Sequence, residues 1–277
     1  MRFILGALFM SIFSAISYAD EKGIFELQCF SFNPGKSSQY EELVETSGLA
    51  AVKKFGANLV GAWKPTDTSD ERLFLLFHHE GDEEAATKIW NSVKTDPDWK
   101  KASEDFQAKN GNAVKAFQRV FLSELDFGSN LQGQQEGSHI FELRTYVTTT
   151  GNLPKLHNRF RNHTVPLFEK HGMKNLVYWS IPKSNSASIN QLASTFAKKG
   201  AELPDFSAIG SAHENLLVYL LEHETEATAK SSFSSFMADP VWKVALADSE
   251  RDAKGSLTAP KGVLSLYLKA CDFSPLK

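Results

Sequence analysis

Residues 140–148 read IFELRTYVT, and their opening Phe141-Glu142-Leu143 occurs earlier in the chain as Phe25-Glu26-Leu27. Further matches follow in the same order in both places: Gly35 with Gly151, Lys54 with Lys170, Gly56 with Gly172, Trp63 with Trp179, residues 96–100 (DPDWK) with 239–243 (DPVWK), and Asp126-Phe127 with Asp272-Phe273. Because chance does not readily preserve the order of separate blocks, the sequence predicts a tandem duplication.

The duplication divides the chain into two predicted domains. The first copy covers residues 24–127 and the second covers residues 139–275, and the Gly-, Gln- and Ser-rich residues 128–138 are typical of a linker. The second copy is longer around residues 182–214. We interpret this Ser- and Ala-rich stretch as a surface insertion with a short helix near residues 189–199.

Each copy is predicted to fold as strand, helix, strand, strand, helix, strand. In the second copy the strands are residues 140–148, 175–181, 215–221 and 262–270, and the helices are 153–170 and 224–237. Pro166 should kink the first helix, Gly172 should cap its end, and Asp239-Pro240 should start a further helix. The βαββαβ order is ferredoxin-like and the fold class is α+β, with two antiparallel sheets that face each other in one barrel-like core.

Composition excludes several classes of protein. A net charge of −3 over 277 residues, without basic clusters, argues against nucleic acid as the main partner. The two cysteines cannot make a disulfide scaffold or a four-thiolate zinc site, and we expect Cys29 and Cys271 to be buried and unpaired. We predict no metal and no cofactor, while association of two chains into a homo-oligomer stays open.

Residues 1–19, MRFILGALFMSIFSAISYA, have the form of a signal peptide. One cation precedes a short apolar run, and small residues lie before Ala19, after which cleavage is expected. An uncleaved membrane anchor is the alternative, but the run is short for a span. We therefore predict an exported protein, periplasmic or secreted, without a stable membrane span after cleavage.

The strand at residues 140–148 alternates between two kinds of side chain. Phe141, Leu143 and Thr145 share one face, and Glu142, Arg144 and Tyr146 share the other. We expect the apolar face to meet the helices, which would place the polar face in a cleft between the two sheets. There Arg144 could hold an anion and Tyr146 could donate a hydrogen bond. The alternative is that Glu142 and Arg144 only satisfy neighbouring groups across the sheet.

The helix that follows is rich in histidine and arginine. His163 lies near its apolar face and beside Pro166, so it could point into the cleft and act as an acid or base. A structural role, hydrogen-bonded to backbone, is the commoner one for such a residue. His171 is explained by the helix dipole. The two histidines would lie roughly 12 Å apart along a helix, too far to share a metal.

The run from Phe141 to Trp179, the Ala-rich helix before Asp239-Pro240-Val241-Trp242, and Asp272-Phe273-Ser274-Pro275 resemble the NIPSNAP family. The resemblance covers most of residues 140–275. It is fainter in the first copy, where Phe55 replaces His171 and Ala50 replaces Pro166. It implies a dimeric α/β-barrel fold, and exported tandem versions resemble a bacterial subgroup. The family has no settled activity, and related barrels include cofactor-free monooxygenases and haem enzymes.

Three functions are compatible with these features. The first is binding of a small organic ligand between the sheets by Glu142, Arg144, Tyr146 and His163. The second is a cofactor-independent oxygenase or isomerase in which His163 is the base and Arg144 stabilises an enolate, or a variant in which His163 or His171 binds haem. The third is a protein-interaction module of the cell envelope that docks through residues 182–214.

Overall fold

The computed structural model describes residues 23–128, 131 and 139–277, so the predicted signal peptide at 1–19 and most of the predicted linker at 128–138 lie outside the described residues. The first repeat consists of β1 (Gly23–Phe32), α1 (Ser37–Leu43), the π-helical turn η2 (Val44–Gly48), α2 (Leu49–Lys54), β2 (Asn58–Pro65), β3 (Leu73–Glu80), α3 (Glu83–Thr95), α4 (Pro97–Asn110) and β4 (Val114–Glu124). The second consists of β5 (Ile140–Thr148), α5 (Leu153–Arg159), the π-helical turn η3 (Phe160–Thr164), α6 (Val165–Lys170), β6 (Lys174–Ser180), α7 (Ile189–Phe196), the 3₁₀ turn η4 (Ser207–Ile209), α8 (Ala212–Asn215), β7 (Leu216–His223), α9 (Glu226–Ala238), α10 (Pro240–Ala253) and β8 (Thr258–Ala270). Within these ranges, no helix combines the length and the apolar character that a membrane crossing requires.

The helices confirm the duplication. The succession α1, η2, α2 has the same lengths as α5, η3, α6, and the pair α3 and α4 has the same lengths as α9 and α10. Asp96 and Asp239 are both N-caps that precede a proline, as the sequence predicts for Asp239. The widened turn before Pro166 also occurs in the first repeat, where Ala50 takes its place, so the proline is not its cause.

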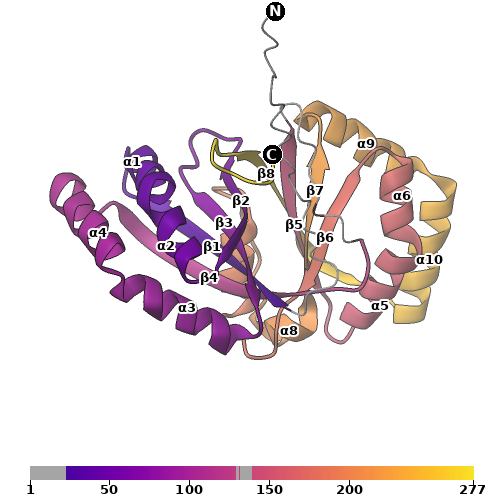
Figure 1. Cartoon of the computed structure of the whole chain (residues 1–277). Coiled ribbons are helices and arrows are strands. Elements are labelled where there is room, and N and C mark those ends of the chain that lie inside the picture. The colour runs from indigo at the N-terminus through magenta and orange to yellow at the C-terminus, as the bar shows by residue number, and fades with distance from the viewer. Residues whose placement is uncertain (1–22, 129–130, 132–138) are drawn as a thin grey trace, which may run out of the picture.

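Eight antiparallel strands form one closed barrel in the order β1-β3-β2-β8-β5-β7-β6-β4. Each repeat contributes a four-stranded ferredoxin-like sheet, and the two sheets join at both edges: β2 pairs with β8, and β4 pairs with β6. Figure 1 shows α1, α2, α3 and α4 of the first repeat on one flank of the barrel and α5, α6, α9 and α10 of the second repeat on the other. One chain therefore supplies both halves of a dimeric α/β barrel, which confirms the predicted fold class.

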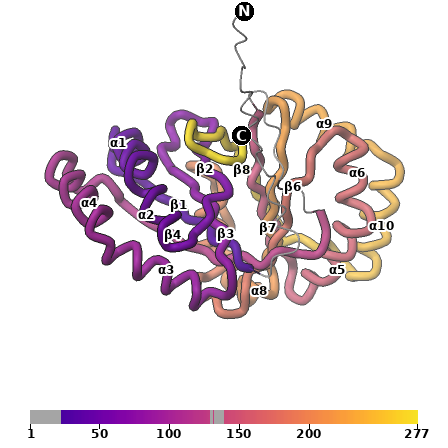
Figure 2. Tube along the Cα trace, viewed as in Figure 1, coloured from indigo at the N-terminus to yellow at the C-terminus, as the bar shows by residue number. Residues whose placement is uncertain are grey.

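The residues after β8 bind the second repeat to the first. Figure 2 shows the C-terminal end beside β2. There the backbone N–H of Cys271 donates to the carbonyl of Ala62 at 2.9 Å, and the N–H of Ala62 donates to Ser274 Oγ, also at 2.9 Å. Cys29 and Cys271 are both free and buried, as predicted.

The barrel interior is apolar and receives part of the insertion. Phe25, Leu27, Phe141 and Leu143 belong to one interior cluster to which strands of both repeats contribute, and α7 adds to it the buried side chains of Ile189, Leu192, Ala193 and Phe196. The predicted short helix of the insertion is present as α7, but the prediction that the insertion lies on the surface is wrong for the apolar face of this helix, because only its other face, with Gln191 and Ser194, is exposed. The apolar face of α7 packs against the side chains that fill the barrel interior, which removes this face from water.

Candidate functional site

The polar face of β5 lies against the helices of the second repeat, not between the sheets. The guanidinium carbon of Arg144 lies 4.2 Å from the ring centroid of Phe233 in α9, and the ring of Tyr146 lies 5.4 Å from that of Phe160 in η3. Phe141 and Leu143 fill the barrel interior instead. The predicted assignment of the two faces is wrong, because the closed interior has no water for charges and the helical side offers partners for them.

On that face, the side chain of Glu142 is fully buried and accepts hydrogen bonds at both carboxylate oxygens. Arg144 Nη1 lies 2.6 Å and Ser265 Oγ 2.5 Å from Oε1, and His223 Nε2 lies 3.0 Å from Oε2. Burial alone would raise the pKa of Glu142, but the hydrogen bond from His223, the charge of Arg144 and the hydrogen bond from Ser265 outweigh it and hold the pKa below its usual value.

Arg144 is equally well satisfied. Its Nε donates to Tyr219 Oη at 2.8 Å, and its Nη2 lies 3.4 Å from Tyr146 Oη. The structure thus brings together Glu142, Arg144 and Tyr146 as predicted, but they already bind one another. This geometry is that of the structural alternative, in which neighbouring groups of the sheet satisfy each other.

The first repeat contains the same carboxylate–histidine pair. Glu26 Oε2 lies 3.0 Å from His79 Nε2 and accepts a hydrogen bond from Trp90 Nε1 at 2.7 Å, while Oε1 accepts from Gln28 Nε2 at 2.7 Å. Sequence reasoning missed His79 and His223. Their equivalent positions near the end of the third strand of each repeat were the signal that could have found them.

His163 does not point into a cleft. It lies in η3 with an exposed side chain, because its turn of the helix faces solvent. His171 Nε2 lies 2.8 Å from Asp239 Oδ2, to which Lys170 Nζ also binds at 2.7 Å. Neither histidine lines any of the pockets described below, so the predictions of a His163 base and of a haem ligand at His163 or His171 have no geometric basis. In the described part of the chain, no three metal-ligating side chains lie together.

A pocket of about 390 Å³ lies between the sheet and the helices of the first repeat. We call it the first-repeat pocket. The sheet contributes Phe30, Leu75 and Phe77, and η2 contributes Val44 and Gly48. The remaining walls come largely from α1, α2, α3 and α4, with Tyr40, Val52, Trp90, Val93 and Trp99. The volume lies within the range of small-molecule sites, and the lining is mainly apolar and aromatic, as in such sites.

The same space in the second repeat is filled. Four aliphatic residues of the first-repeat pocket have larger, aromatic counterparts in the second repeat: Val44 corresponds to Phe160, Val52 to Phe168, Leu75 to Tyr219, and Val93 to Phe236. Those four rings are buried, and ring centroids of Phe168 and Phe236 lie 4.8 Å apart and those of Phe160 and Tyr219 lie 5.3 Å apart. The first-repeat pocket is therefore the volume that these rings occupy in the other copy.

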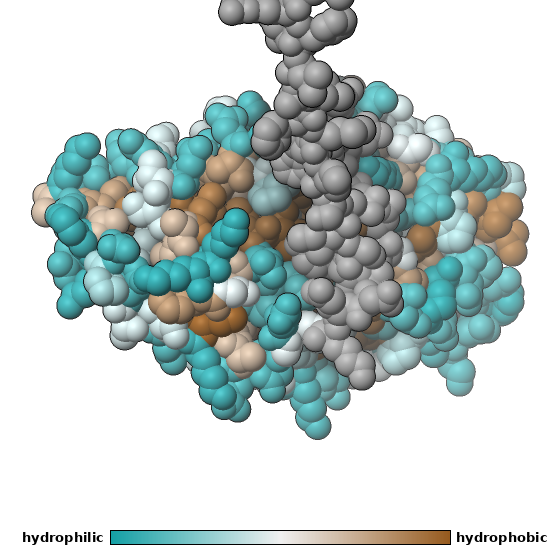
Figure 3. Space-filling model, viewed as in Figure 1, coloured by the Kyte–Doolittle hydropathy of each residue, from teal (hydrophilic) through white to brown (hydrophobic). Residues whose placement is uncertain are grey.

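At other positions in the wall of the first-repeat pocket, the first repeat has the larger side chain and the second repeat the smaller one. Tyr40, Phe77 and Trp90 correspond to the smaller residues Leu156, Leu221 and Phe233, in that order. In the first-repeat pocket, large aromatic side chains thus form the outer walls around the small aliphatic side chains that leave the space open. Figure 3 shows a mainly hydrophilic surface on which apolar side chains are visible between the helices of the first repeat and the strands of the barrel.

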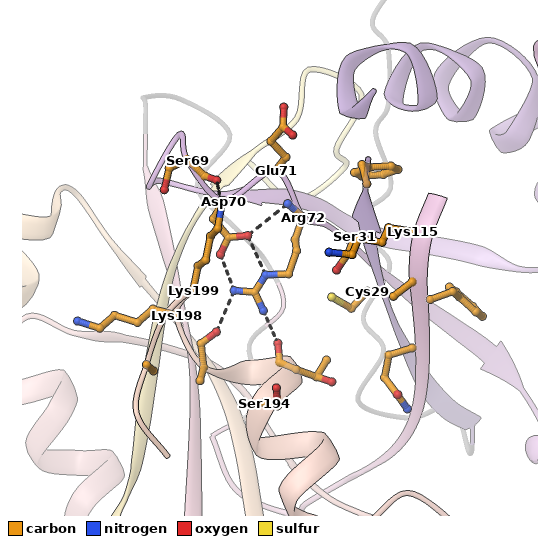
Figure 4. A pocket seen from close by; sticks show the side chains of 18 of the residues that line it. Cys29, Ser31, Ser69, Asp70, Glu71, Arg72, Lys115, Ser194, Lys198 and Lys199 are labelled. Carbon is orange, nitrogen blue, oxygen red and sulfur yellow. Dashed lines mark hydrogen bonds and ion pairs between the residues drawn. The ribbon is translucent and has the colours of Figure 1, made fainter. Parts of the chain in front are cut away.

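A second cavity, of about 600 Å³, lies where the end of α7 meets the first repeat (Figure 4). Arg72 stands at its centre and binds Asp70 through Nε at 2.8 Å and Nη2 at 2.5 Å, and it donates to the carbonyls of Thr195 and Ala197, each at 2.8 Å. Cys29 lies in the wall, and burial raises the pKa of its thiol to about 12. The guanidinium of Arg72 is therefore occupied by Asp70 and by the two carbonyls at the end of α7. We interpret this cavity as the place where the insertion is fastened to the first repeat, not as a binding site.

Residues 25–128, the first repeat, match the model of the NIPSNAP family. The first repeat is a NIPSNAP-family domain. The matched repeat is the one in which sequence reasoning expected the fainter resemblance. No curated protein matches the chain.

Comparison with solved structures gives likenesses of two kinds, one to a single domain and two over nearly the whole chain. A NIPSNAP domain protein from Burkholderia xenovorans is 16% identical over 38% of this chain and 96% of its own, with a TM-score of 0.32. An anthrone oxidase-like protein is 11% identical over 94% of this chain and 96% of its own, with a TM-score of 0.53. A Fusobacterium nucleatum protein provisionally named a monooxygenase is 9% identical over 93% and 94%, with a TM-score of 0.52. At these identities, the two full-length likenesses show the fold alone.

Proposed function

We propose that this protein binds a small, largely apolar organic molecule in the first-repeat pocket. One observation carries the proposal: the first repeat keeps a pocket of about 390 Å³ where the second repeat packs four aromatic rings. Burial of apolar surface stabilises a fold by about 25 cal/mol per Å². The first repeat lacks the burial of four rings, because it has the smaller side chains of Val44, Val52, Leu75 and Val93 at these positions. A ligand that enters the pocket recovers that burial.

The π-helical turn supports the same location. Such turns are rare and are frequently found at functional sites. In the first repeat the turn η2 places Val44 and Gly48 in the pocket wall. The matching turn η3 in the second repeat places Phe160 in the packed core, so the turn is shared while the open space is confined to one copy.

Thermal unfolding in the presence of a panel of apolar and aromatic compounds tests the proposal. A compound present at a hundred times its Kd stabilises the fold by about 2.7 kcal/mol. For a chain of this size, this energy corresponds to a rise in Tm of about 5 to 10 °C. We expect at least one compound to raise Tm and to quench tryptophan fluorescence, because Trp90 and Trp99 line the pocket.

Two variants with filled pockets provide the specificity test. Val52→Phe and Leu75→Tyr introduce the residues that the second repeat has at the equivalent positions. Val241→Phe, at an exposed valine of α10, is the matched control. The compound should stabilise the wild type and Val241→Phe and should leave the Tm of both filled variants unchanged. An equal rise in all four proteins would place binding elsewhere and overturn the proposal.

We further propose that the protein acts outside the cytoplasm, on the strength of the signal-peptide pattern in residues 1–19. Mass spectrometry of the protein recovered from periplasm and medium after expression of the full chain tests this. A mature form that begins at Asp20 is expected. Recovery of the uncleaved chain from the cytoplasm alone would contradict it.

A further inference from the structure

The first-repeat pocket carries positive charge at its edge. Its lining includes the side chains of Lys94 and Arg119 and no aspartate or glutamate. Glu26 lies next to the pocket floor, but its oxygens are taken up by His79, Trp90 and Gln28. The electrostatic character of the pocket lining is therefore set by two cations.

Arg119 has no carboxylate partner within the described residues. Its guanidinium carbon lies 5.1 Å from the ring centroid of Phe121, and its side chain is partly buried. Among the described residues, ion pairs neutralise Arg72, Arg144, Arg161 and Arg251. Arg159 also has no carboxylate partner, but it packs over the ring of Trp242 and donates to Ser249 Oγ in the second repeat. An arginine held in a pocket wall without a counter-ion is a ready site for an anionic group.

The comparison of the two repeats explains why Arg119 is left without a partner. Gln28 pairs with Arg119 across β1 and β4, and in the second repeat Arg144 pairs with Ser265 across β5 and β8. The first repeat therefore has its arginine, Arg119, on its last strand, β4, whereas the second repeat has its arginine, Arg144, on its first strand, β5. In the second repeat, Arg144 Nη1 lies 2.6 Å from the carboxylate of Glu142. In the first repeat, Gln28 donates to the equivalent carboxylate of Glu26, and Arg119 lines the pocket instead.

We propose that the natural ligand is an amphipathic carboxylate: an aromatic or medium-chain apolar body that fills the pocket, with a carboxylate bound by Arg119 and assisted by Lys94. This rests on the proposed function. The planar guanidinium matches a carboxylate through two parallel hydrogen bonds, and the exposed Lys94 adds charge without fixing geometry. The aromatic walls formed by Tyr40, Trp90 and Trp99 suit the apolar body.

Isothermal titration with matched pairs of probes tests the proposal on the full chain. The probes are 1-naphthylacetate with its neutral alcohol analogue 2-(1-naphthyl)ethanol, and decanoate with decanol. The wild type should bind each acid at least tenfold more tightly than its alcohol. Arg119→Gln should remove that preference while it leaves the Kd of the alcohol unchanged, and Arg119→Lys should restore part of it. Lys115→Gln, an exposed lysine on the same strand that lies outside the pocket lining, makes the same change in net charge and should keep the full preference.

Each outcome bears on one of the two proposals. If acids and alcohols bind the wild type equally, or if Arg119→Gln keeps the preference for the acid, the assignment of a carboxylate to Arg119 is wrong while the pocket proposal stands. If 1-naphthyl phosphate binds more tightly than 1-naphthylacetate, a phosphate ligand replaces the carboxylate. If binding of the alcohol persists unchanged in Val52→Phe, the proposed function itself fails.

Discussion

Replacing Glu142 by glutamine removes the carboxylate that pairs with Arg144 and keeps the shape of the side chain. Glu142 is fully buried and the side chain of Arg144 is 12% exposed, so the charge left behind is largely cut off from water. Breaking a buried ion pair from one side costs about 3 to 5 kcal/mol. Because the amide oxygen still accepts hydrogen bonds, we expect the lower end, about 3 kcal/mol of unfolding free energy.

Glu26→Gln in the first repeat is the matched control. Its carboxylate accepts from the neutral donors of Gln28 and Trp90 and adjoins His79, with no arginine in the network. In Glu26→Gln, hydrogen bonds to a charged carboxylate become weaker hydrogen bonds to a neutral amide, which lowers the free energy of unfolding by about 1 kcal/mol. Urea unfolding at pH 7, with an unchanged m-value, should therefore separate the two variants by about 2 kcal/mol. Equal costs would refute the argument that Arg144 makes the two networks energetically different.

The pH dependence has a definite sign. The folded state holds the pKa of Glu142 below its usual 4.5, so ionised Glu142 stabilises the fold above that pH. This contribution is lost as the pH falls from 4.5 through the lowered folded pKa. The difference in stability between wild type and Glu142→Gln should shrink over that window. A difference that stays constant down to pH 3 would contradict the assignment.

Three further perturbations test other parts of the structure. Arg72→Met should release the end of α7 from the first repeat and speed tryptic cleavage at Lys199, and an unchanged cleavage rate would count against the anchoring role. Phe196→Ala should lower the free energy of unfolding by about 3 to 5 kcal/mol in urea titrations, because the ring is fully buried in the barrel interior; a cost below 1 kcal/mol would contradict that burial. Cys29 and Cys271 should react with a thiol reagent at pH 8 only on unfolding, because burial raises both pKa values to about 12; rapid labelling of the native protein would show otherwise.

The repeat and its strand order could be derived from the sequence because they depend on local patterns. The matching blocks that begin at Phe25 and Phe141 reflect equal helix lengths, and the βαββαβ order leaves few ways to bury two sheets. The direction in which each face of β5 points could not be derived. Both faces are buried in a closed barrel covered by helices, so alternation separates two faces without telling which one is inside.

The errors at the site have specific causes. The insertion was predicted to lie on the surface from its composition, although Ile189, Leu192, Ala193 and Phe196 follow the spacing of one apolar helix face. The charged side chains of the second repeat led to a site predicted in that copy. A residue-by-residue comparison of the copies, which sets Val44 against Phe160 and Val52 against Phe168, already contains the signal for an open space in the first repeat.

A crystal structure of the protein with the tightest compound from the thermal panel is the most direct test of the central claim. We expect the compound between β1 and β3 on one side and η2 and α2 on the other, in contact with Leu75 and Val52, and we expect the equivalent space around Tyr219 to remain filled by protein. A compound bound instead beside Arg72 at the end of α7, or among the helices of the second repeat, with the first-repeat pocket vacant, would contradict the account.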